Sequence, residues 1–147
     1  MAQIELVDDT WIDVSPVTIA WVVSDPLRWR SWWPDFALTV DELRGPKGVR
    51  WFVRSARGGT LAGSMEIWLE PVGTGTVAHY FLRLDAVGPT MRRRELDRLA
   101  ARYRVRAKQL LWSVADELDP GRLARIANRR DARPPLDFET FRQLPPA

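Results

Sequence analysis

The chain has 147 residues with a formal net charge of +3, and its 46% hydrophobic and 28% charged residues indicate one globular domain rather than a disordered segment. The sequence holds no cysteine and one histidine, which excludes disulfide bonds and cysteine nucleophiles and argues against a zinc site, so we expect no metal and no other cofactor. No apolar run approaches the roughly 18 residues of a membrane span, and the acidic N-terminus lacks the pattern of a secretion signal, so we expect a cytoplasmic protein.

The chain opens with a predicted strand and two short helices. Residues 3–14 are rich in β-branched residues with interleaved charges, which is typical of a strand. Ser15 and the proline after it supply an N-cap and a first-turn proline for a helix over 16–25, and its nearly continuous apolar residues predict that most of it is buried. A second short helix begins at Pro26 and ends before Pro34, because proline suits the first turn of a helix and disrupts its interior.

The middle of the chain predicts strands that follow one another through short turns. Strand patterns cover residues 36–43, 49–55, 61–70 and 76–87, and glycine-containing turns separate them. Short links favour antiparallel pairing, because parallel neighbours need long crossover connections. Together with the first strand, these segments predict an antiparallel sheet of about five to six strands.

The longest helical pattern begins after Gly88 and continues for roughly 30 residues to Asp119. Its apolar residues are spaced by three and four and therefore form one stripe, made of Leu96, Leu99, Tyr103, Ala107, Leu110, Val114 and Leu118. A short basic helix over 121–130 and a proline-containing tail follow. The sequence thus predicts one domain over 1–118 and a C-terminal extension over 119–147.

The order of these elements and three local motifs resemble the START-like lipid-transfer superfamily, and in particular its bacterial polyketide cyclase/dehydrase-like branch. The first strand ends in an apolar–Asp–x–Ser–Pro step over 12–16, an Asp–Pro pair joins the two short helices at 25–26, and a tryptophan-rich segment over 29–34 follows. Residues 73–85 resemble the last strand of that branch. The resemblance implies an α+β helix-grip fold, in which a curved antiparallel sheet wraps around the long C-terminal helix.

The resemblance also implies a function, which is the binding or carriage of a small hydrophobic ligand between sheet and helix. A lipid, a polyketide or an isoprenoid-like compound fits this class. Trp29 and Trp33 are open to two interpretations, as packing residues only or as part of the cavity lining. The predicted ligand-binding residues come from the two short helices, from the concave face of the strands and from the helical stripe: Trp29, Trp33, Trp51, Met65, Tyr80, Leu84, Tyr103 and Ala107.

Two other functions stay open at this point. A polyketide cyclase, aromatase or dehydratase could use the same cavity, but Tyr80 and Tyr103 are the only polar groups that the sequence offers inside it. His79 alternates to the convex face and Asp8 is interpreted as a solvated charge, so no catalytic residue is assigned and a non-enzymatic binding protein is favoured. The third function is an interaction module whose own tryptophans fill the cavity.

The second half of the chain is basic, with 14 Lys and Arg against 8 Asp and Glu over residues 89–147. The sequence predicts that several of these cations lie on the outward side of the long helix, namely Arg98, Arg102, Arg106 and Lys108. An anionic membrane or an acidic protein could contact this side. Nucleic acid is not an expected partner, because few aromatic residues lie among the basic ones.

Aromatic residues also alternate to the convex face of the sheet, where Phe52, Trp68, His79 and Phe81 form a patch on neighbouring strands. A monomer rarely leaves such a patch uncovered. We therefore expect either the C-terminal tail or a second copy of the chain, in a homodimer, to cover it.

Overall fold

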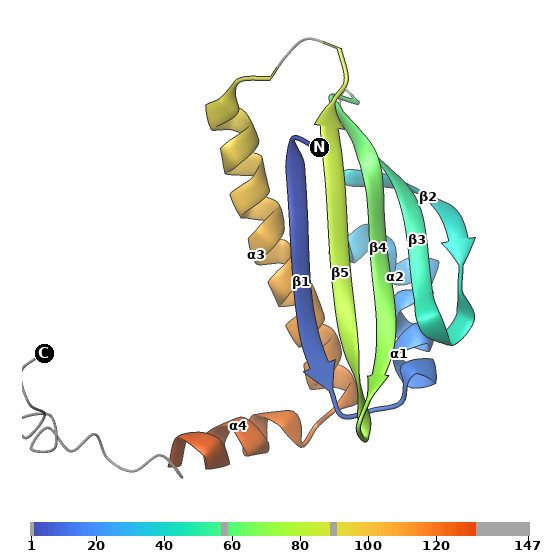
Figure 1. The fold of residues 1–147 in the computed structure, drawn as a ribbon, viewed down its shortest axis with the longest axis vertical. Helices are drawn as coiled ribbons and strands as arrows, with labels where there is room; N and C mark the ends of the chain where they lie inside the picture. The colour runs from blue at the N-terminus through green and yellow to red at the C-terminus, as the bar shows by residue number, and fades with distance from the viewer. Residues whose placement is uncertain (1, 57–58, 89–90, 132–147) are drawn as a thin grey trace, which may run out of the picture.

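A computed structural model describes residues 2–56, 59–88 and 91–131, with side chains up to residue 128, and shows one antiparallel sheet backed by helices (Figure 1). The sheet has five strands in the order β1-β5-β4-β3-β2, and every neighbouring pair is antiparallel. Their bounds are β1 (Ile4–Ile12), β2 (Phe36–Leu43), β3 (Gly48–Ser55), β4 (Leu61–Val72) and β5 (Gly75–Ala86). The predicted α+β helix-grip fold is confirmed, at the lower end of the expected number of strands.

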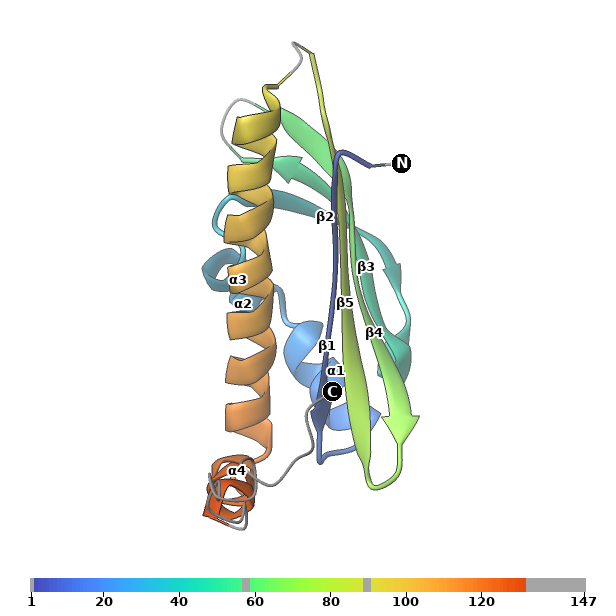
Figure 2. The same ribbon diagram turned by 60° about the vertical axis from the view of Figure 1, so that its left-hand side comes forward.

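Three of the described helices lie on one face of this sheet, and Figure 2 shows the long helix α3 beside the sheet with the two short helices on the same side. The helical segments are α1 (Pro16–Val23), α2 (Pro26–Trp32), the short 3-10 turn η1 (Gly45–Lys47), α3 (Arg93–Leu118) and α4 (Arg122–Asp131). Proline occupies the first turn of α1 and α2, as predicted. The side chain of Asp25 caps α2 by accepting a hydrogen bond from the backbone N–H of Leu27, at 3.0 Å.

The predicted faces of strands and helices are confirmed for the core. Alternate residues of β3, β4 and β5 are buried against the helices, among them Trp51, Met65 and Tyr80. The stripe of α3 is buried in the same core, and α3 lies nearest to the edge strand β1. The core is therefore one layer of side chains between a five-stranded sheet and one long helix, closed at one end by α1 and α2.

One prediction about α1 is wrong. The apolar character of this helix predicts burial of most of its residues, but Trp21 is 79% exposed and Val17 is also exposed. Only one side of a helix can face a sheet, and here Ile19, Val22 and Val23 fill that side. Ala20 is buried as well, and Val17 and Trp21 lie on the surface.

The C-terminal extension begins with the predicted basic helix, α4, and residues 132–147 lie outside the described part of the chain. A polar contact ties the corner between α3 and α4 to the domain. The carboxylate of Asp119 is buried, pairs with Arg125 and accepts a hydrogen bond of 3.2 Å from the backbone N–H of Asp13. The division into a domain over 1–118 and an extension over 119–147 stays a prediction.

Candidate ligand-binding site

An aromatic cluster occupies the space between the sheet and the short helices. It consists of Trp29 in α2, Trp33 at the C-terminal end of α2, Trp51 in β3 and Tyr80 in β5. The ring of Trp51 packs edge-to-face on both neighbours, with centroids 5.3 Å from Trp29 and 5.2 Å from Trp33. Trp33 also stacks on Tyr80 at 6.4 Å. Residues far apart in sequence thus form one continuous set of aromatic contacts.

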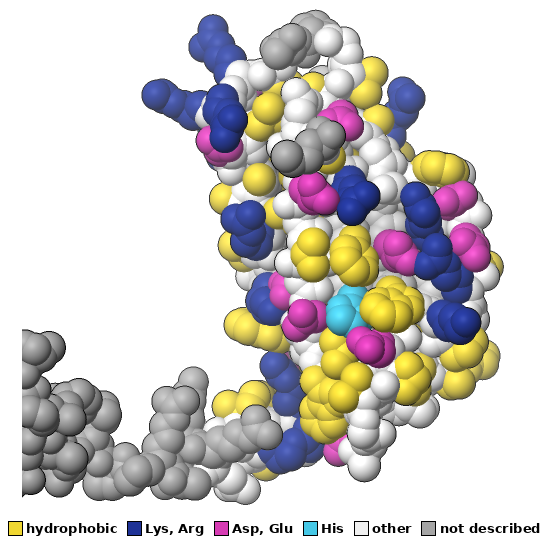
Figure 3. All heavy atoms as spheres, in the orientation of Figure 1, with side chains coloured by type: hydrophobic (Ala, Val, Ile, Leu, Met, Phe, Trp, Pro, Cys, Tyr) yellow, Lys and Arg dark blue, Asp and Glu magenta, His cyan; other side chains and the backbone are white. Residues whose placement is uncertain are grey.

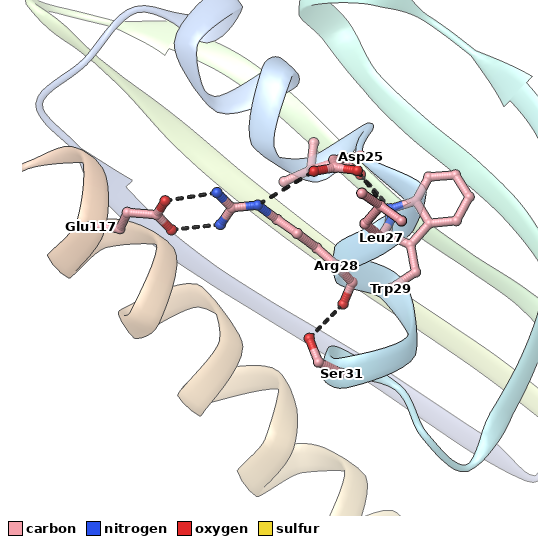
Figure 4. A network of polar contacts seen from close by, with 7 residues as sticks. Asp25, Leu27, Arg28, Trp29, Ser31 and Glu117 are labelled. Carbon is pink, nitrogen blue, oxygen red and sulfur yellow. Dashed lines mark hydrogen bonds and ion pairs between the residues drawn. The ribbon is translucent and has the colours of Figure 1, made fainter.

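Polar contacts position α2, and with it two members of the aromatic cluster (Figure 4). The indole N–H of Trp29 donates to the backbone carbonyl of Val23, at 2.8 Å, and so fixes the angle between α1 and α2. Arg28 donates two hydrogen bonds, of 2.6 and 2.7 Å, to the carboxylate of Glu117 in α3. This bidentate pair holds α2 against the long helix and raises the pKa of Arg28 while it lowers that of Glu117.

The aromatic cluster contains donors that the protein leaves largely unused. The indole N–H of Trp51 is fully buried and has no hydrogen-bond partner among the residues that the structure describes. The hydroxyl of Tyr80 donates to the sulfur of Met65 at 3.0 Å, and a thioether is a weak acceptor. Burial raises the pKa of Tyr80 far above its ordinary value, so this hydroxyl keeps its proton at neutral pH.

The space next to the aromatic cluster is small in this conformation. A gap of about 10 Å³, roughly the space of one water molecule, lies among Trp33, Asp35, Phe36, Tyr80, Tyr103 and Arg106. The ring of Phe36 packs on that of Tyr103, with centroids 5.0 Å apart. Ala107 is buried and does not line this gap.

A group of charges lies at the edge of this gap, where α3 meets the connection between α2 and β2. One carboxylate oxygen of Asp35, Oδ2, accepts from Arg102 at 3.0 Å and from Arg106 at 2.9 Å. Tyr103 lies between these two arginines in sequence and is buried, and its pKa is raised by burial first and by the charge of Asp35 second. Arg106 also lines an outer groove of about 300 Å³ between α2 and α3, together with Ser31, Trp32, Pro34, Gln109, Leu110 and Ser113.

The predicted outward row of cations on α3 is wrong for two of its members. Arg106 turns toward Asp35, and Lys108 pairs with Asp8 of β1 at 2.5 Å. The interpretation of Asp8 as a solvated charge is wrong as well, since its side chain is 15% exposed and points to the helix side of the sheet. Both pairs join distant segments of the chain, since Asp35 and Arg106 are 71 positions apart and Asp8 and Lys108 are 100 apart.

The structure brings together most of the predicted ligand-binding residues. Seven of the eight are buried and Trp29 is half-buried, which confirms the predicted faces: Trp29, Trp33, Trp51, Met65, Tyr80, Leu84, Tyr103 and Ala107. Leu84 stands apart, because it lies four residues beyond Tyr80 on β5, or about 13 Å at the usual rise of a strand. That these residues contact a ligand stays a prediction.

Sequence reasoning missed one groove on the surface. A solvent-open groove of about 530 Å³ lies between α1 and η1 and is lined by Val17, Ala20, Trp21, Ser24, Asp25, Gly45 and Pro46. The sequence feature that could have predicted this groove is the apolar character of α1 on every side, because a helix with one buried face then also exposes apolar residues. Asp35 and Arg106 were missed too, because ion pairs between distant segments leave no trace in periodicity.

The convex face of the sheet carries the predicted aromatic patch, and Figure 3 shows its histidine with hydrophobic side chains beside it. His79 stacks on Trp68 at 4.7 Å and on Phe81 at 6.3 Å, and its ring nitrogen Nε2 contacts Glu70 at 2.8 Å. Phe52 is 54% exposed. Within the described residues this patch is uncovered, and the tail expected to cover it lies outside them.

Comparison with known proteins identifies the fold. No protein-family model matches the chain, and a comparison with curated proteins finds no match. Among solved structures it is similar to the Aha1 dimer from Colwellia psychrerythraea, with a TM-score of 0.54 and 18% identity over 80% of this chain and 98% of that one. It is also similar to a START superfamily protein from Mycobacterium smegmatis, with a TM-score of 0.52 and 16% identity over 78% and 98% of the two chains.

A third similar structure is CalU16 from Micromonospora echinospora, with a TM-score of 0.55 and 13% identity over 86% of this chain and 82% of that one. At identities this low the similarity defines the fold alone. The chain has the START-like helix-grip fold. In the part of the chain that the structure describes, no helix combines the length and the apolar character that crossing a membrane requires.

Proposed function

We propose that this protein binds a small hydrophobic molecule at the aromatic cluster. The observation that supports this most is the indole N–H of Trp51, which is buried without a partner among the described residues. Buried polar groups in folded proteins are nearly always hydrogen-bonded, and an unpaired one costs about 1–3 kcal/mol. An apolar ligand with one acceptor oxygen would pair with this donor and bury its remaining surface against the rings. Lipid, polyketide and isoprenoid-like compounds are all in this class.

Binding requires part of the aromatic cluster to move, since the adjacent gap has only about 10 Å³. Helix α2 is the segment best suited to move. None of its seven residues, all of them described, is fully buried. Trp29 and Trp32 pack half-buried against the core, and the remaining ties are polar contacts with Glu117 and Val23. Segments with few buried contacts open at the lowest free energy. An outward shift of α2 would carry Trp29 and Trp33 away from Trp51.

A second candidate is an interaction module with a self-filled core, and the same small gap favours it. Catalysis of the cyclase or dehydratase type has less support. The raised pKa values of Tyr80 and Tyr103 keep both hydroxyls protonated, so neither is a general base at neutral pH. We also propose that the convex patch is covered by a second copy of the chain or by the tail over 132–147. The basic half of the chain would contact an anionic membrane or an acidic protein, and the protein would be cytoplasmic.

The test compares two neutral ligands of closely similar shape, 2-acetylnaphthalene and 2-isopropenylnaphthalene, by isothermal titration calorimetry. The ketone offers an acceptor that the hydrocarbon lacks, so we expect it to bind the wild-type protein about 3- to 10-fold more tightly, the range of one net hydrogen bond. In Trp51→Phe the two affinities should become equal. The control is Trp112→Phe, which changes a half-exposed indole on α3 and should keep the preference.

The ratio of the two affinities within one variant is the decisive quantity, because any general effect of Trp51→Phe on packing acts on both ligands. Absence of binding by either naphthalene would support the self-filled module instead. Binding with equal affinity to the wild-type protein would show that the Trp51 donor plays no part in recognition.

A further inference from the structure

The charges at the edge of the gap are unbalanced. Two guanidinium groups, of Arg102 and Arg106, share one oxygen of a single carboxylate, that of Asp35. The neighbouring ion pairs are balanced, since Lys108 faces Asp8 and Arg28 faces Glu117. In the part of the chain that the structure describes, no second carboxylate pairs with either arginine, so one positive charge remains in excess at this place.

Arg106 is the better placed of the two arginines for a ligand. Its side chain is 31% exposed, against 53% for Arg102, so water screens its charge less. Arg106 lines both the gap beside the aromatic cluster and the outer groove of about 300 Å³. Its guanidinium has five N–H donors. Among the described residues, one of them donates a hydrogen bond, to Asp35. The planar guanidinium fork fits a carboxylate in two-point contact.

Apolar side chains lie on both sides of Arg106, and on the groove side they alternate with the polar Ser31, Gln109 and Ser113. Trp33, Phe36 and Tyr103 border the gap, and Trp32 and Leu110 border the groove. A molecule with an anionic group on the arginine would therefore place its remaining atoms against aromatic and aliphatic side chains. An apolar body with one acid group matches this arrangement, whereas an inorganic anion would leave the apolar walls unused.

Asp35 occupies the position that such an acid would take. Its carboxylate lies on the connection that carries Trp33 and Phe36, directly after Pro34. Exchange of one carboxylate for another keeps both arginines paired, so it has a small electrostatic cost. The same exchange releases the connection from α3 and frees Trp33 to leave the aromatic cluster.

We propose that the ligand is an amphipathic acid, whose carboxylate replaces that of Asp35 on Arg106 and Arg102 and whose apolar body lies against the aromatic cluster. This inference rests on the proposed function and names its ligand class. Asp35 then acts as an internal substitute for the ligand, and its ion pairs close the site when no ligand is bound.

The test adds 2-naphthoate, the anionic counterpart of 2-acetylnaphthalene, with the same shape. At low ionic strength the wild-type protein should bind the naphthoate about 10-fold more tightly than the ketone, an advantage worth about 1.4 kcal/mol. Arg106→Gln should remove this advantage, which is the ratio of the two affinities within one variant and is therefore insensitive to a loosening of the site that affects both ligands, and Arg106→Lys should retain part of it. Arg104→Gln, an exposed arginine of the same helix, is the matched control.

The variant Asp35→Asn tests whether the carboxylate of Asp35 competes with the ligand carboxylate or instead helps to bind the ligand. Removal of the competing carboxylate should strengthen naphthoate binding by at least about threefold, and the ketone should gain less. Weaker naphthoate binding in Asp35→Asn would overturn the inference, because it would make Asp35 a part of the site. Thermal unfolding of each variant verifies that it is folded at the temperature of the titration.

The outcomes separate this inference from the proposed function. Equal affinities for naphthoate and ketone, or an advantage that Arg106→Gln leaves unchanged, would overturn the inference while the hydrophobic site stands. Absence of binding by the naphthoate and by both neutral naphthalenes would overturn the two together. If only the naphthoate binds, and Arg106→Gln abolishes this binding, the result would support an acidic ligand and contradict the proposal that the indole N–H of Trp51 recognises the ligand.

Discussion

Asp119 shows how one carboxylate holds two parts of the chain together. Its pKa is lowered, chiefly by the hydrogen bond from Arg125 and further by the backbone N–H of Asp13, while burial opposes this. A carboxyl whose pKa is lower in the folded than in the unfolded state stabilises the fold above the unfolded value, which is about 3.9. That contribution is lost as the pH falls through the folded pKa.

We therefore expect Asp119→Asn to lower the midpoint of thermal unfolding by a few degrees at pH 7. The difference from the wild-type protein should shrink as the pH is lowered from about 5 toward 3, because the native carboxyl then takes up a proton as well. Scanning calorimetry across this range provides the measurement. Asp97→Asn is the control, since its exposed pair with Arg93 should change the midpoint little.

Ala107 limits the size of any side chain between α3 and the sheet. It is 2% exposed in a filled interior, so a larger residue has no free space to enter. Ala107→Leu should lower the free energy of unfolding by about 1–3 kcal/mol, as overpacking usually does. Urea unfolding measures the change, and Ala101→Leu on the exposed side of the same helix is the control. An unchanged stability in Ala107→Leu would reveal room for a ligand at this point.

At the scale of elements, α2 is held by a few identifiable contacts, above all the bidentate pair of Arg28 with Glu117. Both side chains are partly exposed, so the pair contributes little to global stability, up to about 1 kcal/mol. Its loss should instead act locally. We expect Glu117→Gln to speed amide hydrogen exchange in α2 severalfold while exchange in β4 and β5 is unchanged.

Hydrogen exchange measured by mass spectrometry or NMR would verify this, with Glu95→Gln at the start of α3 as the control. Equal protection of α2 in the wild-type protein and in Glu117→Gln would contradict the movable role given to this helix. If α2 does move on binding, Glu117→Gln should also accelerate the association of 2-acetylnaphthalene.

Much of this architecture could be predicted from the sequence, because strand alternation and the three-and-four spacing of α3 are local patterns. Each strand begins and ends within about two residues of its prediction, and Pro16 and Pro26 set the helix starts. The site was less predictable. Trp51 meets Trp33 only through the fold, and the pairing of Asp35 with Arg106 depends on segments that no sequence period connects. Burial was therefore foreseen, whereas the filling of the interior was foreseen only as one of three alternatives.

At the scale of the whole molecule, the convex patch is the surface proposed to be covered, either by residues 132–147 or by a second copy of the chain. A chain that ends at residue 131 should expose the patch and bind more 8-anilinonaphthalene-1-sulfonate, or should change its mass in solution. Light scattering and probe fluorescence on both chains provide the measurement. Phe52→Lys places a charge in the patch and should weaken whichever cover is present. A shortened chain with unchanged mass, probe binding and melting temperature would contradict both forms of cover.

The order of strands in the sheet has a consequence for folding during synthesis on the ribosome. β1 is made first, yet its partner in the sheet is β5, which begins at Gly75. At roughly 5–20 residues per second, β1 waits on the order of ten seconds for that partner. During this time Ile4, Leu6 and Ile12, all buried in the finished protein, face water on an unpaired strand. The nascent β1 is thus the segment of this chain that a chaperone has most reason to hold.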